Sequence, residues 1–196
     1  MPPLEKADDA TQRLIDMVIF DRFFDKILKI EGGYSDNPQD SGGKTKYGVT
    51  ESVARNYGYK GDMRNFSIEA AKEVYKRLYW SPLRLDDVAA LDEDVALKLG
   101  DIAVNMGPVQ AAKFFQRALN LFNRRGEKYP ELVVDGMIGK ASIAALKAFM
   151  GQRGAQGGIV LYRVLNCMQG ACYIALAEHR DKDEEFIYGW ILNRVA

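Results

Sequence analysis

EGGYSDNPQDSGGKTKYGVT, residues 31–50, is the stretch of this sequence that decides the fold. It begins with a carboxylate, Glu31, at the point where an apolar helical segment should end, because a pair of glycines terminates helices. A glycine-rich loop or short hairpin should follow, and the turn signal Asn37-Pro38 lies within it. This loop carries a further carboxylate, Asp40, together with two threonines and two tyrosines.

The two carboxylates suit the cleavage of a bond between sugars. The negative end of the helix dipole and partial burial would both raise the pKa of Glu31, so its carboxyl group could stay protonated and donate to a glycosidic oxygen. Asp40, on a polar loop, would stay ionised and could stabilise positive charge or orient water. Each also has an ordinary interpretation, Glu31 as a helix-end residue and Asp40 as a turn residue.

The hydroxyl and aromatic side chains of the same stretch complete a candidate site. Thr45 and Thr50 could hold a water molecule, and the flat rings of Tyr34 and Tyr47 could stack on sugars. Thr50 also has the position of a helix cap, and Tyr47 could be a core residue. Spacing alone leaves both interpretations open.

Outward from this stretch, glycine, proline and capping residues predict a chain of helices. The predicted helices are Met17 to Glu31, Thr50 to Gly58, Ser67 to Tyr79, Asp92 to Met106, Pro108 to Asn123, and 139–150, 158–180 and 183–194. Residues 124–138 read as a charged, turn-rich connection, and 151–158, with four glycines, as the most flexible joint. Short strands are expected only near 46–49 and 132–134, so the chain should be α-rich.

The composition argues against several function classes. Basic and acidic residues balance, 27 to 27, whereas nucleic-acid-binding proteins usually show a basic excess. The single histidine, His179, argues against a catalytic zinc site, which usually needs three protein ligands. Cys167 lies twelve residues before it on a predicted helix, about 18 Å along the axis and too far for a nucleophile and its base. We expect no metal, no cofactor and no nucleic-acid partner.

The pattern E-G-G-Y-S-x-N-P-x-D-x-G-G-x-T-x-Y-G-V-T resembles the opening motif of glycoside hydrolase family 108, the N-acetylmuramidases that include phage endolysins. Several members of this family are called secretion activators. The segment GDIAVNMGP, residues 100–108, resembles the second helix of the family, which in relatives faces the cleft. Residues 135–142 and 186–195 resemble the predicted peptidoglycan-binding region that accompanies the catalytic segment.

The resemblance implies an all-α, lysozyme-like fold, in which a C-terminal helical lobe packs against a helical catalytic lobe. The expected divisions are an N-terminal extension over 1–16, a catalytic region over 17–108 and a helical peptidoglycan-binding region over 109–196. The expected partner is the glycan strand of peptidoglycan.

The resemblance also implies the reaction, which is cleavage of the β-1,4 bond between N-acetylmuramic acid and N-acetylglucosamine with Glu31 as the catalytic acid. The spacing of Glu31, Asp40 and Thr45 is similar to the Glu–Asp–Thr pattern of phage-type lysozymes, in which the carboxylate and the threonine hold the attacking water. The expected substrate contacts are Tyr34, Tyr47, Thr50 and Asn105. Asn105 could instead bond the backbone of the Glu31 loop.

Two alternatives stay open. A lytic transglycosylase would need only one acid, and a non-catalytic wall-binding or secretion-assisting protein could keep the fold without the chemistry. No secretory signal and no uninterrupted run of ~20 apolar residues are visible, so we expect no membrane span. We expect synthesis in the cytoplasm without a signal peptide, and action on the cell wall after release or export.

Overall fold

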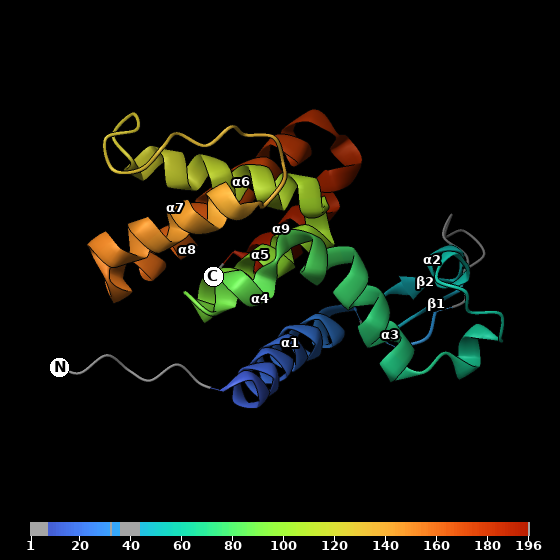
Figure 1. Ribbon diagram of the computed structural model, residues 1–196. Coiled ribbons are helices and arrows are strands. Elements are labelled where there is room, and N and C mark those ends of the chain that lie inside the picture. Colours follow the sequence, from blue (N-terminus) through green and yellow to red (C-terminus); the bar gives the residue numbers. More distant parts are fainter. Residues whose placement is uncertain (1–7, 32, 36–43, 196) are drawn as a thin grey trace. The chain divides into compact units, whose positions relative to one another are not determined.

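The computed structural model describes residues 8–31, 33–35 and 44–195, without the side chains of Asp9, Ile30 and Glu31. It is 75% helical, and within these ranges its sheet consists of two short strands (Figure 1). The predicted all-α fold class is confirmed. The chain divides into two compact units, Met1–Arg77 and Leu78–Ala196, which are described separately below.

The elements follow one another along the chain as helices with short connections. The first unit contains α1 (Asp9–Glu31), β1 (Thr45–Lys46), β2 (Val49–Thr50), α2 (Glu51–Asn56), the 3₁₀ turn η1 (Met63–Asn65) and α3 (Ile68–Tyr75). A π-helical segment, η2 (Lys76–Trp80), leads into the second unit. That unit contains η3 (Ser81–Leu83), α4 (Leu85–Ala89), α5 (Glu93–Met106), α6 (Pro108–Phe122), α7 (Lys140–Arg153), α8 (Ala155–His179), η4 (Asp181–Asp183) and α9 (Glu184–Arg194).

Side-chain caps fix where three of the helices begin. The side-chain oxygens of Thr50, Ser67 and Asp92 each accept a hydrogen bond from the backbone amide three residues later, at 3.3, 3.1 and 2.9 Å. Each bond satisfies an amide that has no partner inside the helix. Pro108 occupies the first turn of α6, where its missing N–H costs nothing. The predicted starts of these four helices are confirmed.

The helix α1 begins eight residues before its predicted start at Met17. Its first turn is capped by Asp8, whose carboxylate accepts a hydrogen bond from the amide three residues later at 2.7 Å. Part of the segment 1–16 is therefore helical. Val18, an apolar residue of this helix, is 51% exposed.

The glycine-rich segment 151–158 is not a loop. Gly154 alone, with a φ of +58°, separates α7 from α8, and the other glycines of the segment are helical. A Cβ on Gly158 would lie 1.8 Å from Oδ2 of Asp92, so this glycine permits close packing rather than flexibility. A strand was also expected near residues 132–134, but these residues form neither a strand nor a helix.

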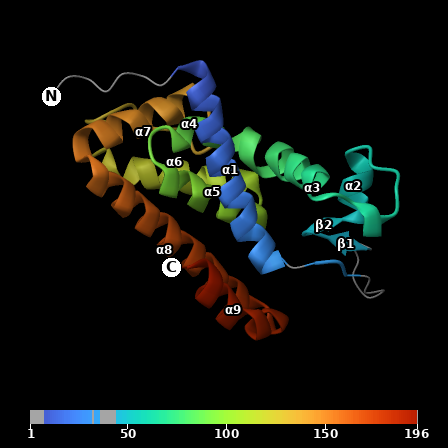
Figure 2. The same ribbon diagram turned by 90° about the horizontal axis from the view of Figure 1, so that it is seen from below.

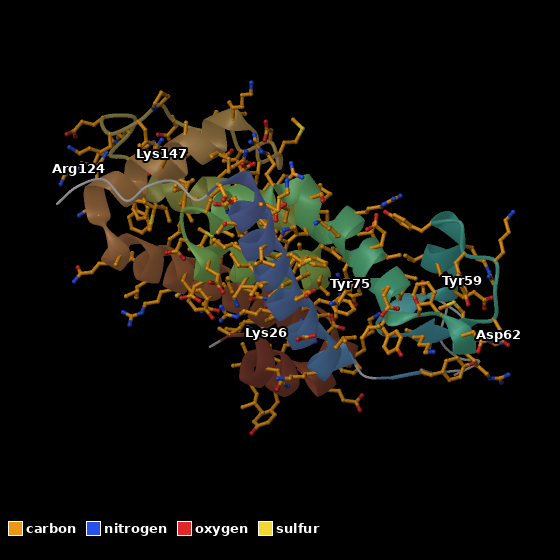
Figure 3. All side chains as sticks on the ribbon, turned by 60° about the horizontal axis from the view of Figure 1, so that its bottom comes forward. Lys26, Tyr59, Asp62, Tyr75, Arg124 and Lys147 are labelled. Carbon is orange, nitrogen blue, oxygen red and sulfur yellow. The ribbon has the colours of Figure 1, made fainter. Side chains whose placement is uncertain are left out.

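Aromatic packing anchors α1 within the first unit. The ring of Tyr75 on α3 meets the buried ring of Phe24 edge to face, with centroids 5.4 Å apart (Figure 3). Beside them, Nζ of Lys72 lies 2.6 Å from a carboxylate oxygen of Asp21. These contacts hold the helix whose last residue is Glu31.

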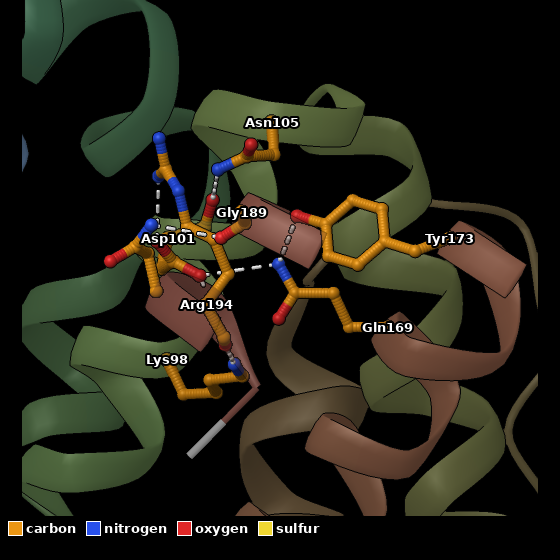
Figure 4. Close-up of polar contacts among 8 residues, drawn as sticks. Lys98, Asp101, Asn105, Gln169, Tyr173, Gly189 and Arg194 are labelled. Atoms are coloured by element: carbon orange, nitrogen blue, oxygen red, sulfur yellow. Dashed lines mark hydrogen bonds and ion pairs between the residues drawn. The ribbon is translucent and has the colours of Figure 1, made fainter. Parts of the chain in front are cut away.

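In the second unit, α5 packs against α4, α6 and α8 (Figures 1 and 2). It carries a buried carboxylate, Asp101, which is 1% exposed. Nη1 of Arg194, at the end of α9, lies 2.9 Å from Oδ1 of Asp101 (Figure 4). Nζ of Lys98 donates to the backbone carbonyl of Arg194 at 2.5 Å. The last turn of α9 is thus tied to α5 by charged groups.

The helix α8 supplies the remaining contacts of this cluster. Nε2 of Gln169 donates to Oδ2 of Asp101 at 3.2 Å and to the hydroxyl of Tyr173 at 3.0 Å. Burial raises the pKa of Tyr173 to about 12, and the negative charge of Asp101 contributes to the shift. We name Lys98, Asp101, Gln169, Tyr173 and Arg194 the buried polar cluster.

In the part of the chain that the structure describes, α8 is the one helix long and apolar enough to cross a membrane, by length and composition alone. It is not an uninterrupted apolar run, because Arg163, Asn166 and Gln169 lie within it. A core helix meets the same two criteria, and α8 packs against α5, α6, α7 and α9.

Candidate active site

The catalytic acid expected from the sequence, Glu31, is the last residue of α1, where the helix was predicted to end. Its side chain lies outside the described residues, and so does the whole of Asp40. The parts of the site that the structure does describe are the end of α1 and the segments that flank residues 36–43.

These flanking segments are joined by backbone pairing. The amide of Ser35 donates to the carbonyl of Thr45 at 2.8 Å, and the amide of Thr45 donates back at 2.9 Å. Thr45 in turn faces Thr50 across the β1–β2 hairpin. Because both backbone groups of Thr45 bond to Ser35, the pair with Thr50 is the non-hydrogen-bonded kind, in which opposite side chains approach most closely.

This register places Ser35, Thr45 and Thr50 side by side on one face of the small sheet, since directly paired residues share a face. Lys46 and the buried Val49 lie on the opposite face. The sequence predicted Thr45 and Thr50 as site residues but did not indicate Ser35. The two-residue turn sets the pairing of Thr45 with Thr50, but it does not set the separate bridge between Ser35 and Thr45.

The turn between the strands consists of Tyr47 and Gly48, with φ values of +53° and +72°. Two positive φ values define the type I′ turn, which matches the twist of a hairpin. Glycine adopts this conformation without cost, whereas a tyrosine there is strained.

Both candidate stacking residues contact cations. The guanidinium of Arg64 lies 5.9 Å from the ring centroid of Tyr34, and Nζ of Lys46 lies 5.2 Å from that of Tyr47. Nζ of Lys46 also donates to the backbone carbonyl of Arg64 at 2.5 Å. The two rings are therefore flanked by positive charge, a feature that the sequence motif alone did not indicate.

Positive charges also act on Asp62, which lies in the segment between α2 and α3. The hydroxyl of Tyr59 donates to the backbone carbonyl of Asp62 at 2.8 Å (Figure 3). The pKa of Asp62 is lowered, mainly by a hydrogen bond from the amide of Arg64 and further by the charges of Arg64, Lys44 and Arg55. Arg55 and Arg64 are in turn paired with the carboxylates of Glu51 and Asp62.

Asn105 belongs to the second compact unit and is described with it. It is exposed on α5, and its Nδ2 donates to the backbone carbonyl of Asp101 at 3.0 Å (Figure 4). The buried ion pairs of Asp101 itself were not predicted, although a carboxylate among the apolar residues of a helix is a recognisable signal. Within the described ranges, no group of three or more His, Cys, Asp or Glu residues could hold a metal ion.

Comparisons with known proteins match both halves of the chain. Residues 24–107 match the family model described as glycosyl hydrolase 108, and residues 110–195 match that of a predicted peptidoglycan domain. The solved structure of Brucella abortus SagA is similar at 21% identity and a TM-score of 0.56, over 91% of this chain and 97% of that one. At this identity the likeness shows the fold alone. No curated protein matches the chain.

The first match includes residues 31–50, and it continues past the boundary between the compact units at Arg77. The second match includes 135–142 and all of α9. Together the two matches support a glycoside hydrolase that acts on peptidoglycan. Residues 24–107 are thus a glycosyl hydrolase 108 region, and residues 110–195 are a predicted peptidoglycan domain.

Proposed function

We propose that this protein is an N-acetylmuramidase that hydrolyses the β-1,4 bond between N-acetylmuramic acid and N-acetylglucosamine in peptidoglycan. One observation carries the proposal: the family match covers a glycine-rich motif that begins with a carboxylate at the C-terminal end of a helix, Glu31 of α1. A helix C-terminus disfavours an ionised carboxylate, so it suits a residue that has to donate a proton.

In the proposed mechanism, Glu31 protonates the bridging oxygen while positive charge develops on the sugar ring. Asp40 stabilises this charge and, with Thr45, holds the water that attacks the anomeric carbon. The pairing of Ser35 with Thr45 supports this role, because it joins the two ends of the segment that carries Asp40.

Substrate binding is assigned to the hairpin and its surroundings. Ser35 and Thr50 flank Thr45 on one face, where their hydroxyl groups can bond the N-acetyl and hydroxyl groups of the sugars. Tyr34 and Tyr47 offer ring surfaces. Asn105 is retained as a proposed contact from the second unit, and we propose 17–108 as the catalytic region.

Mass spectrometry of the products from purified sacculi tests this function. A muramidase adds one water per cleaved bond and leaves a reducing muramic acid end, whereas a lytic transglycosylase leaves an anhydro end. We expect the hydrated products from the wild type and from the control Glu69→Gln, which changes an exposed glutamate at the start of α3. Glu31→Gln should release neither product.

Two results would overturn the proposal. Anhydro products would make the protein a lytic transglycosylase. Intact sacculi after incubation with the folded wild type would leave a non-catalytic wall-binding role, and they would remove Glu31 from any catalytic function.

A further inference from the structure

The second compact unit contains a cavity of about 1000 Å³ that no step of the proposed mechanism uses. It lies between the start of α6, the connection before α7, and α7 itself. Alanines at helical spacing on α7 form one wall: Ala141, Ala144, Ala145 and Ala148. The surface they offer is apolar and consists of methyl side chains.

The opposite wall contains the DGMIG segment that the sequence analysis singled out. Gln116 of α6, which is 2% exposed, donates to Oδ1 of Asp135 at 2.7 Å and accepts from the amide of Gly136 at 3.0 Å. A Cβ on Gly136 would lie 2.7 Å from Cγ1 of Val109, and its φ is +81°, so only glycine fits here. The segment is held rigidly against α6.

This arrangement orients an ionised carboxylate at the cavity. The hydrogen bond from Gln116 lowers the pKa of Asp135, and a bond from the amide of Met137 lowers it further. Asp135 lines the cavity and is exposed. It can therefore accept hydrogen bonds from an ammonium group of a ligand.

The start of α7 offers the complementary feature. Gly139 occupies the cap position without a side-chain cap, so the first amides of this 14-residue helix are open to an acceptor. Ser142, in the first turn, lines the cavity although it is only 2% exposed. A helix N-terminus with a donor hydroxyl favours a carboxylate.

An ammonium site, a carboxylate site and a methyl-lined wall together describe a peptide rather than a sugar. Stacking on a sugar needs an exposed aromatic face, and the aromatic ring among the described lining residues, Tyr129, is 6% exposed. Its hydroxyl already donates to the carbonyl of Leu119 at 2.7 Å. Peptidoglycan combines both polymers, so its peptide and glycan parts can be bound at different sites.

We propose that this cavity binds the peptide stem of peptidoglycan, with the amino group of its diamino acid at Asp135 and a carboxylate at Ser142 and the start of α7. The alanine wall of α7 takes the methyl groups of the alanine residues of the stem. The inference rests on the proposed action on peptidoglycan, but it concerns the second unit and does not involve Glu31.

Isothermal titration of the full chain with the N-acetylated tetrapeptide L-Ala–γ-D-Glu–L-Lys–D-Ala tests the proposal. Asp135→Asn should weaken binding about tenfold, because it removes one charge-assisted bond. Ala144→Phe should abolish binding by filling the cavity from an exposed position. The control Glu178→Gln, an exposed carboxylate on α8 away from the cavity, should bind as the wild type does.

Modified peptides test the same contacts without altering the fold. Acetylation of the lysine side chain should weaken binding to the wild type about tenfold and have little further effect on Asp135→Asn, as expected for two partners of one interaction. Amidation of the C-terminal carboxylate should likewise weaken binding to the wild type about tenfold and have little further effect on binding to Ser142→Ala. Failure of the tetrapeptide to bind the wild type, equal binding by Ala144→Phe, or displacement by a tetramer of N-acetylglucosamine would overturn the proposal.

The variant Glu31→Gln separates this proposal from the proposed enzymatic function. It should bind the tetrapeptide as tightly as the wild type while it fails to cleave sacculi. Unchanged cleavage by this variant with normal peptide binding would refute only the role of Glu31, whereas normal cleavage by the wild type without peptide binding would refute only the cavity proposal.

Discussion

The hairpin region of the first unit and the buried polar cluster of the second unit are built in opposite ways. Around Thr45 the chain contains little regular secondary structure, and the turn of the hairpin holds Tyr47 in a strained backbone conformation. Around Asp101 three helices meet, and the charged groups are almost completely buried. We propose that the hairpin presents its hydroxyl groups and rings to a ligand, whereas the polar groups of the cluster bond to one another.

We infer from this contrast that the proposed chemistry and the stability of the fold depend on different parts of the chain. Buried charged groups that satisfy one another are costly to disturb, whereas exposed, strained segments tolerate change and often carry function. Substitutions in the buried polar cluster should therefore change the free energy of unfolding, and those near the hairpin should change activity. The following predictions test this separation.

The largest effect on stability is expected for Asp101→Ala. It leaves the buried charges of Lys98 and Arg194 without their carboxylate, which costs about 3–5 kcal/mol. Urea unfolding followed by circular dichroism measures this loss. The control Asp94→Ala removes an exposed carboxylate from the same helix and should change the free energy of unfolding by less than about 1 kcal/mol. Equal effects of the two substitutions would contradict a stabilising role for the cluster.

A smaller loss is expected for Gly158→Ala. Its methyl group would collide with Asp92 and displace the cap of α5, which costs about 1–2 kcal/mol. Gly151→Ala is the matched control, because nothing lies within 4 Å of a Cβ at that helical position. It should stabilise α7 by about 0.5–1 kcal/mol. Thermal unfolding distinguishes the expected loss of stability in Gly158→Ala from the expected gain in Gly151→Ala. A stabilised Gly158→Ala variant would refute the close contact with Asp92.

Alkaline pH should weaken the buried polar cluster in a defined window. The pKa of Tyr173 is raised from 10.0 to about 12 on folding, so its contribution to stability is complete below pH 10 and is lost as the pH rises to 12. At pH 11 the loss is about 1 kcal/mol. Unfolding free energies at pH 9 and pH 11 measure it, and Tyr173→Phe should show a smaller difference between the two pH values. An identical pH dependence in that variant would contradict this assignment.

The smallest change in stability is expected at the hairpin. Tyr47→Gly relieves the left-handed conformation of the turn, and the added freedom of the unfolded chain offsets part of that gain, so stability should change by less than about 1 kcal/mol. Activity on sacculi should fall by about tenfold, because a stacking ring is lost. Unchanged activity would show that Tyr47 serves the fold alone.

The sequence predicted best those features that depend on local chemistry. Caps at Thr50, Ser67 and Asp92 and the end of α1 at Glu31 follow from single side chains and glycines, and the structure confirms them. The close contact of Gly158 was missed, because it depends on a residue 66 positions earlier in the chain.

The candidate site shows the same limit. Thr45 and Thr50 could be selected from the motif, but Ser35 is added by an isolated bridge to Thr45, which lies outside the hairpin register. The cluster at Asp101 depends on Arg194, 93 residues away, and no local pattern indicates such a partner. Contacts between residues that are distant in the sequence could therefore be identified only from the structure.

The central claim is that Glu31 supplies the proton for cleavage while contributing little to the fold. Its most direct test is the rate of sacculus lysis by Glu31→Gln, measured on the same preparation as its urea unfolding midpoint. We predict a fall in rate of at least about 1000-fold with an unchanged midpoint. Lysis at the wild-type rate, or a loss of activity that follows from unfolding, would contradict the claim.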